Sequence, residues 1–170
     1  MDKGLLHLYW GEGKGKTTAA MGLAVRALGA GLQVSIVQFL KNGQSGELVP
    51  LKNLGAVIYT GEAGTKFVSQ MTEEEKETVR KRQNEQLLEA LASPCDMLIL
   101  DEACAALELG MIDEKLLQRA VLERPFAREV ILTGRSPAQW MKDAADYSTE
   151  MVCHKHPYDK GIMARRGVEF

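Results

Sequence analysis

The sequence predicts an α/β fold with a mostly parallel central sheet of about six strands and helices on both faces. Short apolar runs alternate along the chain with longer amphipathic ones, as in strands joined by crossover helices. Residues 97–100 (MLIL) are apolar at every position, which is typical of a strand covered on both faces. The length of 170 residues, without repeats or a linker rich in Pro or Ser, favours one domain over residues 1–170.

Each element follows from its local pattern. Strands are expected over residues 5–10, 33–40, 56–60, 97–100, 129–133 and 148–154, and helices over residues 16–30, 72–92 and about 114–123, the last capped by Asp113. Thr72 and Glu75 have the spacing of a capping box, and Ser136 with Pro137 and Gln139 predicts another helix start. Ligands of such folds bind beyond the carboxyl ends of the strands, so the residues after each strand are the functional candidates.

Charge and cysteine content exclude several classes of protein. The 21 basic and 23 acidic residues give a net charge of -2, which does not favour a nucleic-acid binder. No stretch approaches the roughly 20 apolar residues that a membrane-spanning helix needs. The three cysteines include no CxxC pair, so a disulfide framework or zinc site is not expected, and free thiols fit a reducing cytosol. We expect a cytoplasmic protein that partners neither nucleic acid nor a membrane.

The first strand runs into a glycine-rich loop and then a helix. The loop consists of Gly11, Glu12, Gly13, Lys14, Gly15, Lys16, Thr17 and Thr18. Glycines let backbone N–H groups turn toward phosphate oxygens, and the helix N-terminus adds partial positive charge. In a P-loop, Lys16 would reach phosphate oxygens and the Thr17 hydroxyl would bind Mg²⁺, although Trp10 stands where the strict pattern has glycine. This predicts a P-loop NTPase fold of the RecA-like type; the alternative is a glycine-rich turn with solvated lysines.

Two carboxylates, Asp101 and Glu102, follow the apolar strand at residues 97–100. In P-loop proteins a carboxylate at this place holds Mg²⁺. Adjacent residues at a strand end point in different directions, so one can face the metal while the other holds a neighbouring loop. Spacing alone does not decide between them, and two acids that only cap the next helix are the alternative.

Five segments in this order resemble the P-loop ATP:corrinoid adenosyltransferases, also called cob(I)alamin adenosyltransferases. The segments are GEGKGKTTAA (11–20), VQFLK (37–41), LDE (100–102), LTGR (132–135) and KHPYDKGIMARRGVEF (155–170). Many ATPases share the loop, but its combination with this ending is far more specific. The loop of this family looks like x-G-x-G-K-G-K-T, so Trp10 fits the resemblance.

The resemblance implies transfer of the 5′-deoxyadenosyl group of ATP to the Co(I) of a reduced corrinoid (cobalamin or a precursor), with release of tripolyphosphate. It implies a transferase of the cob(I)yrinic acid a,c-diamide adenosyltransferase type that uses Mg²⁺, forms a homodimer and meets a flavodoxin-like reductant protein. The cobalt is the nucleophile, so the protein only orients the reactants and stabilises charge. Because the whole triphosphate leaves, we expect a nucleotide pose unlike that of ordinary kinases.

Lys16 and Arg135 are the expected catalytic residues, because both can bring positive charge to the phosphates. A surface ion pair is the alternative for Arg135. The resemblance also implies corrinoid contacts within residues 61–70, where Phe67 would pack against the lower face of the ring and keep water from the cobalt. Ser69 replaces a second aromatic residue that members often have, and Phe67 could instead be a core residue. Lys41 is expected to meet phosphate or corrinoid.

Two other functions stay open at this point. A RecA-like ATPase would use Glu102 to activate water for attack on the γ-phosphate. A non-catalytic module would bind ATP and a corrinoid without transferring the adenosyl group. The products of a reaction with ATP and reduced corrinoid distinguish all three functions.

Overall fold

The computed structural model describes residues 3–61 and 66–169. In it, six strands form one sheet in the order β3-β2-β4-β5-β1-β6, and every pair of neighbours is parallel. The strands are β1 (Leu6–Trp10), β2 (Val34–Gln38), β3 (Val57–Tyr59), β4 (Met97–Asp101), β5 (Glu129–Gly134) and β6 (Tyr147–Glu150). The predicted α/β architecture with a mostly parallel sheet is confirmed.

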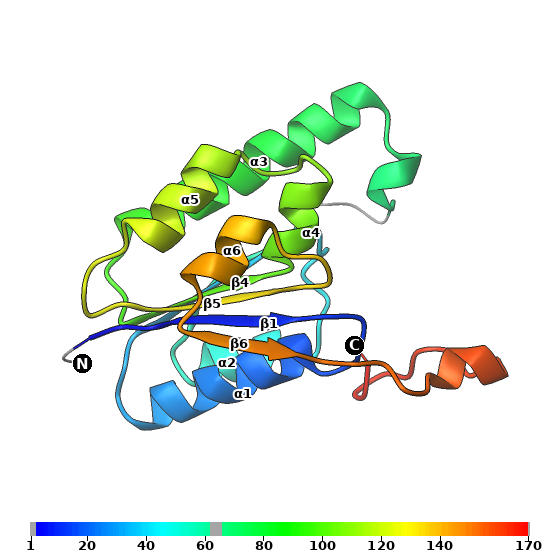
Figure 1. Cartoon of the computed structure of the whole chain (residues 1–170), viewed down its shortest axis with the longest axis horizontal. Coiled ribbons are helices and arrows are strands. Elements are labelled where there is room, and N and C mark those ends of the chain that lie inside the picture. Colours follow the sequence, from blue (N-terminus) through cyan, green and yellow to red (C-terminus); the bar gives the residue numbers. More distant parts are fainter. Residues whose placement is uncertain (1–2, 62–65, 170) are drawn as a thin grey trace.

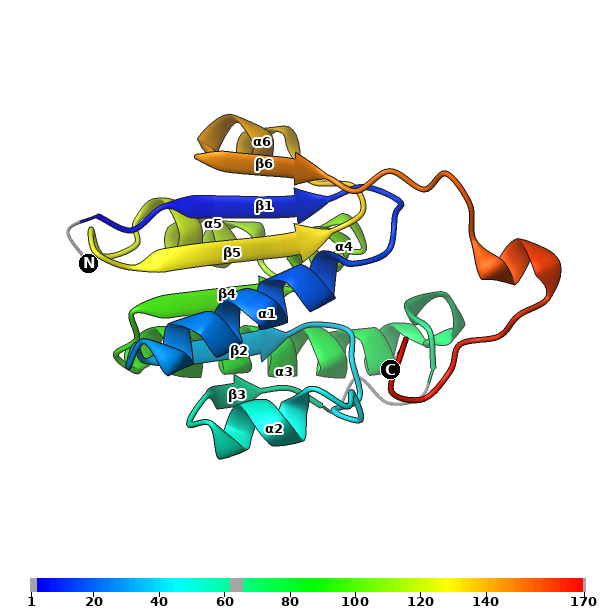
Figure 2. The ribbon, with the colours of Figure 1, turned by 90° about the horizontal axis from the view of Figure 1, so that it is seen from below.

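Helices cover both faces of the sheet (Figures 1 and 2). One face carries α1 (Lys16–Gly29) and α2 (Leu48–Asn53), and the other carries α3 (Glu73–Ala92), α4 (Ala103–Glu108), α5 (Glu114–Leu122) and α6 (Gln139–Ala144). Two short 3₁₀ helices, η1 (Val68–Gln70) and η2 (Pro157–Lys160), lie outside these layers. Over the described residues, none of the helices combines the length and the apolar character needed to cross a bilayer.

The central strands have a core on each side. Successive residues of β4 alternate between the two faces: Leu98 and Leu100 pack with the α3–α6 layer, whereas Ile99 packs with Ala24 of α1 and Ile131 of β5. All five side chains are fully buried. Burial of a large apolar side chain contributes about 1.5–3 kcal/mol, so this double layer holds the ends of β2, β4 and β5 firmly together.

Two of the three predicted helix caps are confirmed. Thr72 and Glu75 form a capping box, with the Glu75 amide donating to Thr72 Oγ1 at 3.2 Å and the Thr72 amide donating to Glu75 Oε2 at 2.8 Å. Asp113 caps α5 by accepting from the Leu116 amide at 2.7 Å. The predicted cap at Ser136 is wrong, because residues 135–138 form the connection from β5 and α6 begins only at Gln139.

The last strand is shorter than the predicted residues 148–154. β6 ends at Glu150 because its partner β1 ends at Trp10, and the final ladder bond runs from the Met151 amide to the Trp10 carbonyl at 2.7 Å. The following residues form an arm that projects away from the sheet and then returns toward it (Figure 2). On its return, the Val168 carbonyl accepts a hydrogen bond from Lys14 Nζ at 3.2 Å.

Candidate functional site

The loop between β1 and α1 ends in a glycine that starts the helix. Gly15, the N-cap of α1, has a φ of 116°, a left-handed conformation that glycine adopts at little cost. The amides of the first helical turn, at Lys16, Thr17 and Thr18, have no acceptors within the helix. Together with the helix dipole, such amides form an anion-binding site. The loop therefore has the geometry expected of a P-loop.

Two glycines of the loop also serve packing. The Gly11 amide donates to the Arg135 carbonyl at 3.1 Å, and the Gly13 amide donates to the Met151 carbonyl at 2.6 Å. A Cβ atom at Gly11 or Gly13 would lie only 2.7 or 2.6 Å from the Met151 carbonyl oxygen. The close passage of the chain leaving β6 thus demands glycine at both positions, in addition to the role toward phosphate that the sequence pattern predicts.

Lys16 folds back over the loop. Its Nζ donates to the carbonyls of Gly11 and Gly13 at 2.6 and 2.7 Å. Burial lowers the pKa of Lys16, and the Glu102 carboxylate partly opposes this by attraction. The ammonium group is thus held at the phosphate loop by two neutral acceptors, which an anion can replace.

Arg135 lies beside the same loop, at the exposed edge after β5. Its Nη1 is 3.2 Å from Glu12 Oε2, and the two side chains are 69% and 65% exposed. The surface ion pair considered as the alternative is present. A pair this exposed contributes at most about 1 kcal/mol, so it exchanges readily for another anion.

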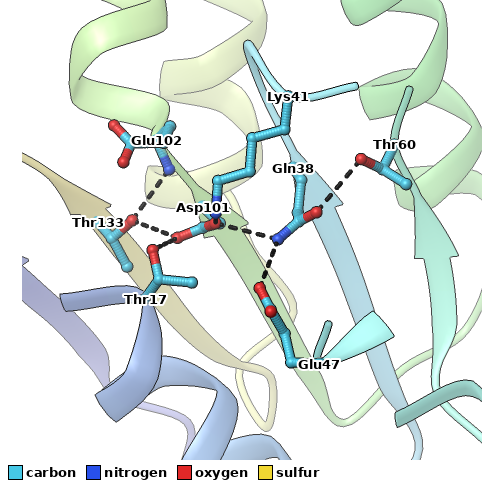
Figure 3. A network of polar contacts seen from close by, with 8 residues as sticks. All are labelled: Thr17, Gln38, Lys41, Glu47, Thr60, Asp101, Glu102 and Thr133. Carbon is cyan, nitrogen blue, oxygen red and sulfur yellow. Dashed lines mark hydrogen bonds and ion pairs between the residues drawn. The ribbon is translucent and has the colours of Figure 1, made fainter. Parts of the chain in front are cut away.

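Asp101 is the buried centre of a polar network (Figure 3). Its Oδ1 accepts from the hydroxyls of Thr17 and Thr133 at 2.8 and 2.7 Å. Its Oδ2 accepts from Gln38 Nε2 at 3.2 Å and from Lys41 Nζ at 2.6 Å. A carboxylate offers about four acceptor positions, so these partners use its whole capacity. Asp101 joins the P-loop helix to the ends of β2 and β5.

The Glu102 side chain points in a different direction from that of Asp101, as expected for adjacent residues at a strand end. Its backbone adopts a left-handed conformation with φ of 61°, which costs about 1–2 kcal/mol, and its amide donates to Thr133 Oγ1 at 2.9 Å. The side chain is half-buried, and within the described part of the chain its carboxylate has no hydrogen-bond or ion-pair partner. Burial raises the pKa of Glu102, and the neighbouring Asp101 charge adds to the increase.

A cleft of about 820 Å³ opens beside this pair of residues. Its polar lining includes Thr17, Lys41, Glu47 and Glu102, and its apolar lining includes Met21 and Val25 of α1, Pro50 of α2 and Leu54, which follows α2. Residues 167–169 of the returning arm also line it. Clefts of this size and mixed lining are typical of sites for nucleotide-sized ligands.

The segment predicted to contact a corrinoid is described only in part, because residues 62–65 lie outside the described residues. Phe67, which precedes η1, is 76% exposed. The interpretation of Phe67 as a core residue is therefore wrong. Its ring is available to a ligand or another chain at the carboxyl edge of the sheet.

Four polar residues of the network in Figure 3 were not predicted from the sequence: Gln38, Glu47, Thr60 and Thr133. Thr133 has a signal, since it is a polar residue that ends an apolar strand in the LTGR segment. Glu47 has none, because it follows an irregular stretch and caps a helix of only six residues. Over the described residues, no three His, Cys, Asp or Glu side chains come together as a ready-made metal site.

The chain is similar to a known protein family over almost its whole length. A family described as ATP:corrinoid adenosyltransferase BtuR/CobO/CobP matches residues 2–170. The chain is 31% identical over 172 residues to the corrinoid adenosyltransferase of Pseudomonas aeruginosa, covering 99% of this chain and 85% of the relative. It is 33% identical over 175 residues to that of Escherichia coli and 32% identical over 178 residues to corrinoid adenosyltransferase CobA of Salmonella typhimurium, each time covering 99% of this chain and 87% of the relative. The chain therefore belongs to the ATP:corrinoid adenosyltransferase family.

Proposed function

We propose that this protein is a corrinoid adenosyltransferase, a transferase that moves the 5′-deoxyadenosyl group of ATP to the Co(I) of a reduced corrinoid and releases tripolyphosphate. The observation that carries this conclusion is the family match over residues 2–170, which spans the phosphate loop, the Asp101 network and the cleft. The named relatives are transferases of this kind. Neither a RecA-like ATPase nor a non-catalytic binding module finds support among them.

The residue roles follow from where charge develops. Attack at the ribose C5′ makes the whole triphosphate the leaving group, so negative charge grows on the α-phosphate. Lys16 and the amides of the first turn of α1 are the nearest preorganised positive groups, and Arg135 stands at the edge of the loop. Stabilisation of developing charge by such groups is usually the largest catalytic contribution. Lys16 would exchange its two carbonyl partners, and Arg135 would exchange Glu12, for phosphate oxygens.

The donor atoms in the cleft fit Mg²⁺. Thr17 and Glu102 both line the cleft, and oxygen donors of this kind, completed by phosphate oxygens, are what Mg²⁺ prefers. We assign these two residues as the direct ligands, because Asp101 has its acceptor positions filled by protein partners. Asp101 then orients Thr17 from behind. When bound, Mg²⁺ would neutralise part of the triphosphate charge.

The position of the cleft favours an unusual nucleotide pose. It lies beyond Thr17 and Glu102, between α1 and α2, with apolar walls suited to a base. In ordinary P-loop enzymes the γ-phosphate lies at the metal-binding carboxylate. Here the adenosine, rather than the γ-phosphate, would lie beside Thr17 and Glu102. This pose would direct C5′ toward the carboxyl edge of the sheet. A crystal structure with ATP in the ordinary pose would exclude this arrangement.

The corrinoid contacts, assembly and location are further parts of the proposal. Phe67 would pack on the lower face of the ring and exclude water from cobalt, and Lys41, which lines the cleft, would meet phosphate or a corrinoid side chain. We also propose a single nucleotide-binding domain, a homodimer, a flavodoxin-like reductant protein and a cytoplasmic location.

An anaerobic assay with ATP, Mg²⁺ and chemically reduced cob(I)alamin tests the function. We expect loss of the cobalt(I) absorbance, with formation of adenosylcobalamin and tripolyphosphate. ADP and phosphate with unchanged corrinoid would favour an ATPase instead. Binding of both substrates without any product would favour a binding module.

A further inference from the structure

Leu40 has a backbone conformation that its side chain disfavours. It lies two residues beyond β2 and has a φ of 57°, in the left-handed region that glycine adopts readily. For other residues this conformation is disfavoured roughly fivefold to thirtyfold. The Leu40 side chain is half-buried and packs against the core of the α3–α6 layer. Such a conformation persists only where the surrounding structure holds it.

Gln83 of α3 holds the Leu40 backbone in this turn. Its Oε1 accepts a hydrogen bond from the Leu40 amide at 2.7 Å, and its Nε2 donates to the Met111 carbonyl at 2.9 Å. Because only the nitrogen of the side-chain amide can donate to a carbonyl, its oxygen must face Leu40. Gln83 is only 3% exposed, and buried hydrogen bonds are costly to leave unmade. Gln83 therefore ties the end of β2 to the connection between α4 and α5.

The turn at Leu40 directs the next side chain back toward β4. The Phe39 amide donates to the Asp101 backbone carbonyl at 3.0 Å, so the chain still follows β4 at that residue. Two residues further on, Lys41 Nζ lies 2.6 Å from Asp101 Oδ2 (Figure 3). Among the described residues, Lys41 is the only cation that forms an ion pair with Asp101. A relaxed Leu40 backbone would turn Lys41 away and leave a buried carboxylate without its counter-ion, which is strongly unfavourable.

Glu102 shows the same arrangement on the neighbouring strand. Its φ is 61°, and its amide donates to Thr133 Oγ1 at 2.9 Å. Over residues 3–61 and 66–169, Leu40 and Glu102 are the two residues other than glycine with a positive φ. Both follow the carboxyl ends of adjacent strands, and a side chain from another element binds the amide of each. Strained backbone of this kind clusters at functional sites, so the turn at Leu40 belongs to the site.

We propose that Gln83 is a positioning residue for adenosyl transfer: it holds the Leu40 turn that brings Lys41 to the buried carboxylate. Asp101 in turn orients Thr17, which the proposed function makes a ligand of Mg²⁺. Gln83 is not among the described residues that line the cleft, so it acts only through these contacts. The inference rests on the proposed function only in that Mg²⁺ and ATP occupy the cleft.

Calorimetric titration with Mg²⁺ and ATP, without any corrinoid, tests the inference. Gln83→Leu should bind ATP about tenfold more weakly than wild type, the effect of one lost hydrogen bond. Leu40→Gly should stay within about threefold of wild type, because glycine adopts the turn unaided. The double variant Gln83→Leu/Leu40→Gly should regain most of the lost affinity. A role of Gln83 in packing alone would not respond to glycine at residue 40.

Asn84→Leu is the matched control. Asn84 lies next to Gln83 on α3, and its Oδ1 accepts from the Asp113 amide at 2.9 Å. It therefore ties α3 to the end of the same α4–α5 connection but makes no hydrogen bond to Leu40. Asn84→Leu should keep wild-type affinity for ATP, with either leucine or glycine at residue 40.

A second pair of variants tests the turn if Gln83→Leu does not fold. Leu40→Val places a β-branched side chain where φ is positive, which is strongly disfavoured, so ATP should bind more weakly. Leu40→Met keeps an unbranched side chain of similar size and should bind ATP as wild type does. Equal affinities of Leu40→Val and Leu40→Met would overturn the inference.

Urea unfolding of wild type, both single variants and the double variant needs no ligand. The losses in the free energy of unfolding should be less than additive, because glycine removes the strain that Gln83 opposes. Additive losses, unchanged affinity in Gln83→Leu, or a double variant that binds ATP no better than Gln83→Leu would each overturn the inference. If the cycle is as expected but no adenosylcorrinoid forms, only the proposed function is disproved.

Discussion

The two halves of the candidate site differ in how they are held. At the end of β4, Asp101 is fully buried and bonded to four side chains. At the phosphate loop, Lys16 is bonded to backbone carbonyls and the guanidinium of Arg135 is bonded to the exposed Glu12. The carboxylate half is fixed by buried protein partners, whereas the cationic half has protein partners that a ligand can replace. An anionic substrate can bind Lys16 and Arg135 only if it replaces their protein partners.

The difference has a simple energetic origin. A buried charge is costly unless all of its acceptor positions are satisfied, so the surroundings of Asp101 cannot be loosened. Arg135 is exposed and gains little from Glu12, and Lys16 is held by neutral carbonyls, so both can exchange these partners for a phosphate. Changes in the carboxylate half should therefore act on stability, and changes in the cationic half should act on activity.

Asp101→Ala should produce the largest effect. It leaves Lys41 without its counter-ion and removes the acceptor of Thr17, Thr133 and Gln38, so we expect a loss of about 3–5 kcal/mol in the free energy of unfolding. Urea unfolding followed by circular dichroism measures this. Asp143→Ala, at an exposed position on α6, should change stability by less than about 0.5 kcal/mol. A loss below about 1 kcal/mol for Asp101→Ala would show that the network does not hold the site.

Lys16→Met should act on catalysis. Removal of one preorganised charge at the leaving group should lower kcat/KM for ATP roughly 10²- to 10³-fold, the range for a single stabilising donor. The melting temperature should change little, since only two partly exposed hydrogen bonds are lost. Lys14→Met is the matched variant, because Lys14 Nζ donates to the Val168 carbonyl of the returning arm rather than to the loop, and its loss of activity should be smaller. Equal losses of kcat/KM in Lys16→Met and Lys14→Met would contradict a specific catalytic role for Lys16.

Arg135→Ala and Glu12→Ala break the same ion pair from opposite sides. If Arg135 moves to phosphate, Arg135→Ala should lower kcat/KM about tenfold, as expected for a charged hydrogen bond. Glu12→Ala frees the guanidinium and should raise kcat/KM slightly. Both should change the free energy of unfolding by less than about 1 kcal/mol. Equal decreases in activity would mean that the pair itself, rather than a phosphate contact, matters.

Glu102→Gln should give a small, pH-dependent effect on stability. Burial raises the pKa of Glu102, so the folded protein holds this proton more tightly than the unfolded chain. Wild-type stability is then lost as pH rises from about 4.3, the ordinary pKa of Glu, through the raised pKa of the folded state. The variant lacks this loss, so it should be more stable than wild type at pH 7, with the difference vanishing below about pH 4. Urea unfolding between pH 4 and 8 checks this, and a difference that grows toward low pH would contradict it.

Local patterns of the sequence predicted most of the fold. The apolar runs located all six strands, and the capping residues Thr72 and Asp113 marked the starts of α3 and α5, because these signals lie within a few neighbouring residues. The short helices α2 and α4 escaped prediction, since six residues carry too little periodicity. β6 ends where its partner β1 ends, and α6 begins only after the connection at residues 135–138. No local sequence pattern predicts either boundary.

For the site, the glycine-rich loop and the carboxylate pair could be recognised in the sequence, because each is contiguous in the chain. The packing of the sheet makes Asp101 a buried carboxylate whose acceptor positions are filled and leaves Glu102 lining the cleft. It also brought Gln38, Lys41 and Thr133 to Asp101, since the strand order places the ends of β2, β4 and β5 side by side. The cleft and the place of Glu47 in it depend on α1 and α2 lying on the same face of the sheet. Such contacts join residues far apart in the chain, and only the packing of the whole sheet brings them within hydrogen-bond distance.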